Sequence, residues 1–201
     1  MTADSSIYDS ERVAAAYAFT RPSVHRHLVA RLPSYLSRPG PIAAALDIGC
    51  GAGMSTAALA LVAKRTVGLE PHRPMLAHSG QVAPTAVFCV GRAEALPFSP
   101  GAFDLVTAAG ALNYADVALS LGEVARVLSA RGLFAPYDFS AGRRIRDDTR
   151  LAAWHDEFQA RFPSPPGYAL DLRALDYRAH GLALAGYEAI EVGITMSLTQ
   201  Y

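Results

Sequence analysis

Three glycines alternate with other residues directly after an apolar run that contains one carboxylate. The stretch reads LDIGCGAGMST over residues 46–56, with Asp47 in the run and Gly49, Gly51 and Gly53 behind it. Glycine adopts backbone conformations with positive φ and lets a ligand come close to the backbone. In parallel sheets, cofactors bind at such a loop between a strand and the next helix. We therefore expect a cofactor site here.

A second acid helps to define the ligand. Glu70 ends the next apolar run, a position where a carboxylate accepts hydrogen bonds from ribose hydroxyls. The dinucleotide pattern G-x-G-x-x-G fails because its sixth position is Met54, and Asp47 suits an ammonium group better than a phosphate. Loop and acid together predict a ribose-bearing cofactor without a pyrophosphate. A solvated charge at a strand end is the alternative interpretation of Glu70.

The elements that position these residues alternate along the chain. Strands are predicted at 43–48, 65–70, 86–91, 103–109, 132–138 and 188–196, and helices at 54–64, 73–82, 116–130 and 171–185, after two helices near 9–19 and from Pro22 to about Leu36. This order predicts an α/β fold, a doubly wound and mostly parallel sheet with helices on both faces. We expect one domain over 1–201, with N-terminal helices in 1–40 and a lid-like insertion at 139–170.

The composition is that of a globular domain. Of 201 residues, 51% are hydrophobic and 18% are charged, which suits one full-sized core. The 18 basic and 18 acidic side chains cancel, so we expect neither nucleic acid nor a membrane as a partner. Cys50 and Cys89 lack the spacing of metal ligands, so no metal is expected, and they indicate a reducing compartment. With no signal peptide and no run long enough to span a membrane, a cytoplasmic protein is expected.

Four ordered motifs resemble one family. They are LDIGCGAG (46–53), VGLEPHRPML (67–76), GRAEALPFSPGAFDLVTAAGALNY (91–114) and LGEVARVLSARGLF (121–134). This combination is similar to the class I S-adenosylmethionine (SAM)-dependent methyltransferases, in the small-molecule branch often labelled type 11 or ubiquinone-biosynthesis-like. The resemblance covers about residues 8–138 and implies a Rossmann-like fold with SAM as the cofactor.

The resemblance also implies a set of cofactor-binding residues at the strand ends. From the amino-acid end of SAM through ribose and adenine to the sulfonium, they are Asp47, Gly49, Gly51, Gly53, Glu70, Pro71, Ala93, Glu94, Ala109 and Gly110. Relatives often carry an aspartate where this chain has Arg92, so Glu94 or a backbone carbonyl would meet the adenine amino group.

An upstream stretch, AYAFTRPSVH (16–25), is similar to the Y-x-x-x-R-P-x-Y segment of the same subgroup. In that segment Tyr17 and Arg21 would cover the methionine end of SAM, where an arginine suits the carboxylate. A plain linker arginine is the other interpretation.

Candidate acceptor-binding residues lie in two places. Asn113 and Tyr114 follow the fourth predicted strand and would face the methyl acceptor. In the insertion, Trp154, Phe158 and Phe162 are spaced by four, which indicates one face of a helix. That face either packs in the ordinary way or serves as a lid, in which Trp154 and Phe158 contact the acceptor.

Two side chains are candidates for handling the acceptor's proton. His155 is the histidine we nominate as a general base, and Tyr114 is the second candidate, although a lone histidine is more often structural. His25 and His27 lie on different faces of their helix and indicate no metal site.

We predict an enzyme that transfers a methyl group from SAM to an oxygen, nitrogen or carbon atom of a small molecule by in-line displacement. One alternative keeps SAM but transfers no methyl group, as in a pericyclase, a decarboxylase or a regulatory partner. The other alternative, a nucleotide-dependent oxidoreductase, is disfavoured by Met54.

The sheet of this family has seven strands, and residues 188–201 leave room for only the sixth. We therefore expect the last strand to be missing or shortened and the open edge to favour a homodimer.

Overall fold

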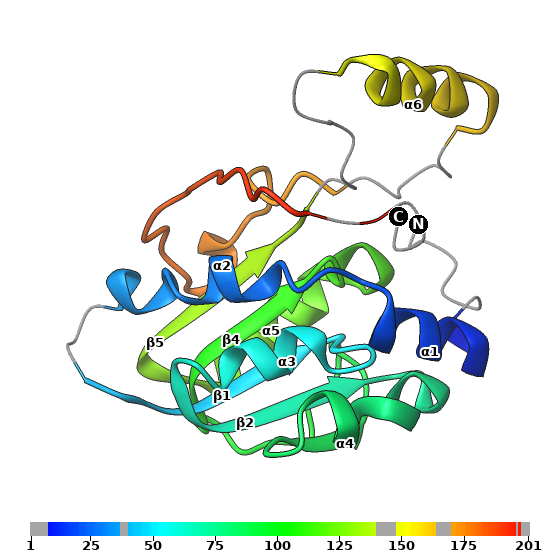
Figure 1. Ribbon diagram of the computed structural model, residues 1–201. Coiled ribbons are helices and arrows are strands. Elements are labelled where there is room, and N and C mark those ends of the chain that lie inside the picture. Colours follow the sequence, from blue (N-terminus) through cyan, green and yellow to red (C-terminus); the bar gives the residue numbers. More distant parts are fainter. Residues whose placement is uncertain (1–7, 37–39, 140–147, 164–169, 196, 198–201) are drawn as a thin grey trace.

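A computed structural model describes residues 8–36, 40–139, 148–163, 170–195 and 197 (Figure 1). Its five strands form one parallel sheet in the order β3-β2-β1-β4-β5. The strands are β1 (Ile42–Ile48), β2 (Ala63–Glu70), β3 (Val87–Val90), β4 (Phe103–Ala109) and β5 (Leu128–Tyr137). The chain runs outward from β1 to β3 and then returns to the other side of β1 with β4. A crevice forms at such a reversal, outside the carboxyl ends of the strands.

Helices lie along both faces of the sheet (Figure 1). They are α1 (Glu11–Phe19), α2 (His25–Val29), α3 (Met54–Leu59), α4 (Ser79–Val82), α5 (Val117–Val127) and α6 (Arg150–Arg161), with 3₁₀ turns η2 (Leu32–Tyr35), η3 (Arg73–His78), η4 (Leu112–Tyr114) and η5 (Arg178–His180). The Asp116 side chain begins α5 by accepting a hydrogen bond from the Leu119 N–H at 3.0 Å. None of the helices in the described ranges is long and apolar enough to cross a membrane.

Two apolar layers sandwich the sheet. On one face, side chains of β1 and β4 pack against α5 through Leu46, Ile48, Val106, Val124 and Val127. On the other face, the alternate residues pack against α2 and α3 through Val29, Ala45, Ala58, Leu59 and Leu105. Central strands buried on both faces are expected of a parallel sheet covered by helices.

A polar brace fixes the loop between β3 and β4. The Arg126 guanidinium donates to the carbonyl oxygens of Leu96 and Phe98 at 2.8 and 2.7 Å, and it pairs with Glu123 one turn earlier on α5. Glu123 in turn accepts the Leu96 N–H at 2.7 Å. The brace therefore holds the 91–98 loop, which carries Ala93 and Glu94, against α5.

Most of the predicted elements are confirmed, with shifted ends. The first five predicted strands form the sheet, and the helices expected near 9–19, 54–64 and 116–130 are α1, α3 and α5. The helix predicted at 73–82 is a 3₁₀ turn followed by the single turn of α4. The one predicted from Pro22 to Leu36 divides into α2 and η2.

Two predictions after β5 are wrong within the described residues. The helix predicted at 171–185 is replaced by turns, because Asp171 and Asp176 accept local backbone N–H groups and Gly181 takes a φ of +75°. The strand predicted at 188–196 pairs with no strand over 188–195. Glu188 instead forms an ion pair with Arg31 and accepts the Tyr35 hydroxyl. No strand follows β5 in the described part of the chain, so the expected sixth strand is not formed there.

The insertion predicted at 139–170 is described in part, since 140–147 and 164–169 lie outside the described residues. Its centre, α6, stands apart from the sheet (Figure 1) and has no buried residue. The predicted aromatic face is confirmed. The Trp154 and Phe158 rings stack at 5.3 Å, and the Phe158 and Phe162 rings lie 5.1 Å apart.

The packing of the core predicts that truncating two leucines to alanine lowers the free energy of unfolding by different amounts. Leu105 is 0% exposed in β4, whereas Leu184 is 80% exposed after η5. We expect Leu105→Ala to lower the free energy of unfolding by about 2–5 kcal/mol, because it removes buried surface and leaves a cavity. Leu184→Ala should change it by less than about 0.5 kcal/mol. Urea unfolding of both variants checks this, and equal effects would contradict the assignment of the core.

Candidate active site

The candidate site lies where the loops after β1 and β4 meet. Gly49, Gly51 and Gly53 have φ values of +65°, +54° and +93°, a region that side chains rarely adopt. The Gly49 N–H donates to the Leu69 carbonyl oxygen of β2 at 2.8 Å. A Cβ atom at Gly49 would come within 2.4 Å of the Ala111 Cβ. Glycine at this position is therefore what allows the two loops to touch.

Asp47 is a fully buried carboxylate beneath the glycine loop. It accepts hydrogen bonds from the hydroxyls of Ser55 at 2.6 Å, Thr56 at 2.7 Å and Thr107 at 2.9 Å. Burial raises the pKa of Asp47 to about 6, against the opposing effect of the three hydroxyls. In the described part of the chain no cation pairs with it. The site therefore contains negative charge suited to a positively charged ligand.

Glu70 joins the end of β2 to the same loop. Its Oε2 accepts the Gly51 N–H at 2.9 Å and its Oε1 accepts the His72 N–H at 3.0 Å. The residue is only 5% exposed, so the alternative of a solvated charge is wrong. Burial raises the pKa of Glu70, and the two backbone donors lower it.

A cluster of three tyrosines joins segments that are far apart in the sequence. The Tyr8 hydroxyl lies 3.3 Å from that of Tyr17 and 3.1 Å from that of Tyr114, and each pair of rings meets edge to face. The Arg21 guanidinium lies over the Tyr17 ring, 4.2 Å from its centroid. Sequence reasoning missed Tyr8, because only the fold brings it to Tyr114, 106 positions away.

The segment before α1 is also tied to the loop after β2. Asp9 Oδ1 lies 2.8 Å from His72 Nδ1, and the Tyr8 and His72 rings lie 6.0 Å apart. Residues that precede the sheet in the sequence therefore pack beside the loop that carries Glu70 and Pro71.

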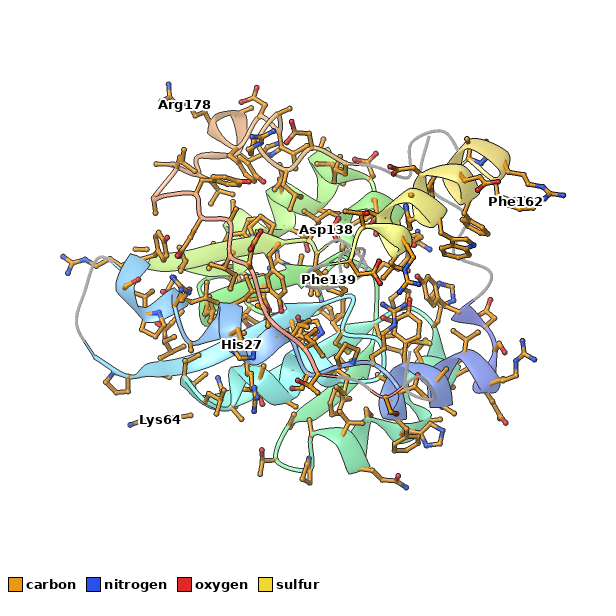
Figure 2. All side chains as sticks on the ribbon, turned by 45° about the horizontal axis from the view of Figure 1, so that its top comes forward. His27, Lys64, Asp138, Phe139, Phe162 and Arg178 are labelled. Carbon is orange, nitrogen blue, oxygen red and sulfur yellow. The ribbon has the colours of Figure 1, made fainter. Side chains whose placement is uncertain are left out.

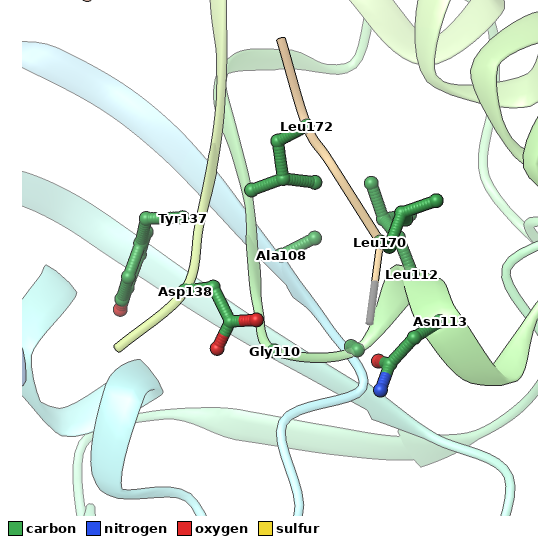
Figure 3. Close-up of a pocket in the computed structure, with 9 residues that line it drawn as sticks. Ala108, Gly110, Leu112, Asn113, Tyr137, Asp138, Leu170 and Leu172 are labelled. Carbon is green, nitrogen blue, oxygen red and sulfur yellow. The ribbon is translucent and has the colours of Figure 1, made fainter. Parts of the chain in front are cut away.

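The side of the site next to β5 contains a small pocket (Figure 3). It is lined by Ala108, Gly110, Ala111, Leu112, Asn113, Tyr137, Asp138, Leu170 and Leu172. The Gly110 N–H donates to the Tyr137 carbonyl oxygen at 2.9 Å and fixes the turn after β4. In Figure 3, Asp138 lies near this turn, whereas Tyr137 points to the other side of β5. A wider groove continues from there past Tyr17, Arg21 and the glycine loop.

Comparison with known proteins agrees with this geometry. A family profile described as "Methyltransferase domain" matches residues 46–135, from the glycine loop to β5. An uncharacterized methyltransferase of Synechocystis is 38% identical over 96 residues, which are 46% of this chain and 45% of that protein. The uncharacterized methyltransferase YcgJ of Bacillus subtilis is 33% identical over 138 residues, covering 57% of this chain and 54% of that protein.

Solved structures extend the likeness to the fold. The crystal structure of YcgJ matches with a TM-score of 0.52 at 27% identity, over 69% of this chain and 60% of that one. A putative type II methyltransferase from Anaeromyxobacter dehalogenans matches in fold alone, with a TM-score of 0.63 at 22% identity over 82% of this chain and 68% of that one. Residues 46–135 thus resemble a methyltransferase domain, and the fold of the chain is that of such methyltransferases. The chain spans about half the length of the curated relatives it matches.

The sheet brings most of the predicted cofactor residues to one edge. Asp47, Glu70 and Gly110 end or follow β1, β2 and β4, and Pro71 is exposed beside Glu70. On the predicted adenine side, Ala93 is buried. The Glu94 side chain accepts the Asp116 N–H at 3.0 Å and lies 3.6 Å from Arg92. Arg92, which departs from the family pattern, thus pairs with the acid predicted to replace the missing aspartate.

The fold does not bring the predicted α6 residues to this edge. Trp154 and Phe158 are 57% and 41% exposed, and His155 lies on the same separate helix. Figure 2 shows Phe162 at the outer end of α6, away from Asp138 and Phe139. His155, the general base nominated from the sequence, is half-buried on this helix, and its Nδ1 has no hydrogen-bond partner among the described residues.

The buried Asp47 predicts a pH-dependent stability of the unliganded protein. Its pKa is raised from 3.8 to about 6, so the folded state binds the proton more tightly than the unfolded state does. Relative to Asp47→Asn, the wild type should gain up to about 3 kcal/mol of unfolding free energy as the pH falls from 7 towards 4. Urea unfolding across this range measures the difference, and parallel curves for the two proteins would contradict the assignment.

Proposed function

We propose that the chain is a methyltransferase that binds SAM across the carboxyl ends of β1, β2 and β4 and transfers its methyl group to an oxygen, nitrogen or carbon atom of a small molecule. The observation that carries the proposal is Asp47, a buried carboxylate without a cationic partner in the described residues. SAM carries an ammonium and a sulfonium, and either charge would offset the cost of burying this anion. The match of residues 46–135 to a methyltransferase domain, a family that uses SAM in general, supports the same choice.

The second carboxylate fits a ribose. Each oxygen of Glu70 accepts one backbone N–H, which leaves each with a lone pair for one hydroxyl. Pro71 and the braced loop with Ala93 and Glu94 are proposed to border the adenine. Tyr17 and Arg21 are proposed to cover the methionine end, where Arg21 is a chemically suitable partner for the carboxylate.

The cofactor supplies an activated methyl group, so the protein's task is to orient the acceptor and exclude water. Ala109 and Gly110 are proposed to support the reacting end, and Asn113 and Tyr114 to face the acceptor. The tyrosine cluster of Tyr8, Tyr17 and Tyr114 would exclude water from this side. Trp154, Phe158 and His155 are proposed acceptor contacts that require α6 to move onto the groove. The exposure of the two aromatic rings supports that proposal.

Detection of S-adenosylhomocysteine, the demethylated form of the cofactor, tests the proposed function. Purified protein is incubated with SAM and a panel of phenols, amines and carboxylic acids, and S-adenosylhomocysteine is measured by mass spectrometry. Methyl transfer predicts S-adenosylhomocysteine that depends on one class of acceptor. Tight SAM binding without any product would favour the alternative of a SAM-binding protein that transfers no methyl group. A rise in melting temperature with NAD(P) and none with SAM would favour the oxidoreductase.

The ribose assignment predicts the effect of a conservative change. We expect Glu70→Gln to weaken SAM binding by about 1.5–3 kcal/mol, because a hydrogen bond to a charged group is lost. Calorimetry measures the change, with Glu157→Gln on the exposed face of α6 as the control. Glu70→Ala is less informative, since it leaves both the Gly51 and the His72 N–H without an acceptor, whereas the Gln side chain keeps an acceptor oxygen for one of them. Unchanged affinity in Glu70→Gln would remove this residue from the site.

The loop assignment predicts different outcomes at two glycines. At Gly51 the nearest atom to an added Cβ is the Met75 Cε at 3.4 Å, so Gly51→Val should fold. Its positive φ would still strain the loop by about 1–3 kcal/mol and abolish SAM binding. Gly49→Val should fail to fold stably, because its Cβ would overlap Ala111. Circular dichroism and calorimetry distinguish these results, and normal SAM binding by Gly51→Val would contradict the assignment.

A further inference from the structure

We propose that His25 donates a hydrogen bond from its Nε2 to an oxygen atom of the methyl acceptor, and that Tyr137 is the positioning residue that fixes the His25 ring. The proposal rests on the function proposed above and adds a residue that faces the acceptor. It also commits to an acceptor that carries oxygen near the reacting atom.

The fold brings these two residues together across the groove. His25 begins α2 and Tyr137 ends β5, and His25 Nδ1 lies 3.0 Å from the Tyr137 hydroxyl oxygen. The Phe139 ring meets the His25 ring edge to face at 5.6 Å. Both residues line the same groove as Gly49, Gly51 and Ala109. A polar pair with an aromatic neighbour therefore lines the groove that also passes the glycine loop and Ala109.

The proposal places the proton of this contact on Tyr137. The Tyr137 hydroxyl then donates to His25 Nδ1, its partner at 3.0 Å in the described residues. Burial, together with the Arg21 charge, lowers the pKa of His25 to about 4, and burial raises the pKa of Tyr137, so both groups are neutral near pH 7. A neutral imidazole with an accepting Nδ1 carries its proton on Nε2. That N–H has no partner within the described part of the chain.

The pair lies at the β5 end of the sheet, next to β4. The Tyr137 carbonyl oxygen accepts the Gly110 N–H at 2.9 Å, so the backbone of Tyr137 is anchored to the turn after β4, while its side chain points to the other side of β5 and meets His25. Glu70, the proposed ribose ligand, ends β2 on the other side of β1. A hydroxyl oxygen has two lone pairs. One can accept from His25 Nε2–H while the other remains available to the methyl carbon.

A pair of small probes tests the proposal without knowledge of the natural acceptor. The probes are 4-fluorophenol and fluorobenzene, which differ by the hydroxyl group, and binding to protein loaded with S-adenosylhomocysteine is measured by ¹⁹F NMR. The variants are His25→Phe and Tyr137→Phe, which keep a ring at each position. His27→Phe, at an exposed position two residues along α2 and labelled in Figure 2, is the matched control. Calorimetry with S-adenosylhomocysteine on every sample reports whether the cofactor site is intact.

We expect the wild type and His27→Phe to bind 4-fluorophenol in preference to fluorobenzene. His25→Phe should bind 4-fluorophenol about threefold to tenfold more weakly, as for the loss of one neutral hydrogen bond, and Tyr137→Phe by a smaller factor. In ¹⁵N NMR spectra, the His25 proton should lie on Nε2 in the wild type and distribute over both nitrogens in Tyr137→Phe. A wild type that binds both probes equally or binds neither, or a His25→Phe variant with unchanged preference, would overturn the proposal. Failure of the wild type to bind S-adenosylhomocysteine would instead contradict the proposed function.

Discussion

The site depends on one buried charge. Asp47 ends a strand at the centre of the sheet, and its three hydroxyl donors come from the start of α3 and from β4. These hydrogen bonds join three elements at the point where the strand order reverses. They satisfy the carboxylate oxygens without neutralising the charge, and burial of an unpaired charge is costly. The buried Asp47 charge can therefore interact electrostatically with a ligand bound at the glycine loop.

Glu70 complements Asp47 in a different way. Its donors are backbone N–H groups of Gly51 and His72, so the acid orders the loop that surrounds it. The two carboxylates therefore lie on either side of one loop. Asp47 lies beneath the glycine loop, and Glu70 is bonded to the Gly51 N–H within it. Elements from distant parts of the sequence then pack around this centre. They include the tyrosine cluster, the His25–Tyr137 pair and the brace from Arg126 to the 91–98 loop.

The parts of the site that sequence analysis predicted are local. Glycine spacing, the acid at each strand end and the alternation of apolar runs are set within a few residues, and the structure confirms the elements that carry them. The strand predicted at 188–196 is wrong because strand propensity needs a neighbouring backbone, and Glu188 is engaged by Arg31 and Tyr35 instead. Tyr8 and His25 gain their surroundings from residues more than a hundred positions away. No periodicity in the chain could indicate those contacts.

The contact between Gly49 and Ala111 has a mechanical consequence. The loop after β1 belongs to the proposed cofactor side and the loop after β4 to the proposed acceptor side, and no space separates them at this point. Packed protein interiors are nearly incompressible and transmit displacement. A shift of the first loop towards Ala111 would therefore press on the second loop. The contact between the Gly49 backbone and the Ala111 methyl group thus couples the positions of the two loops mechanically.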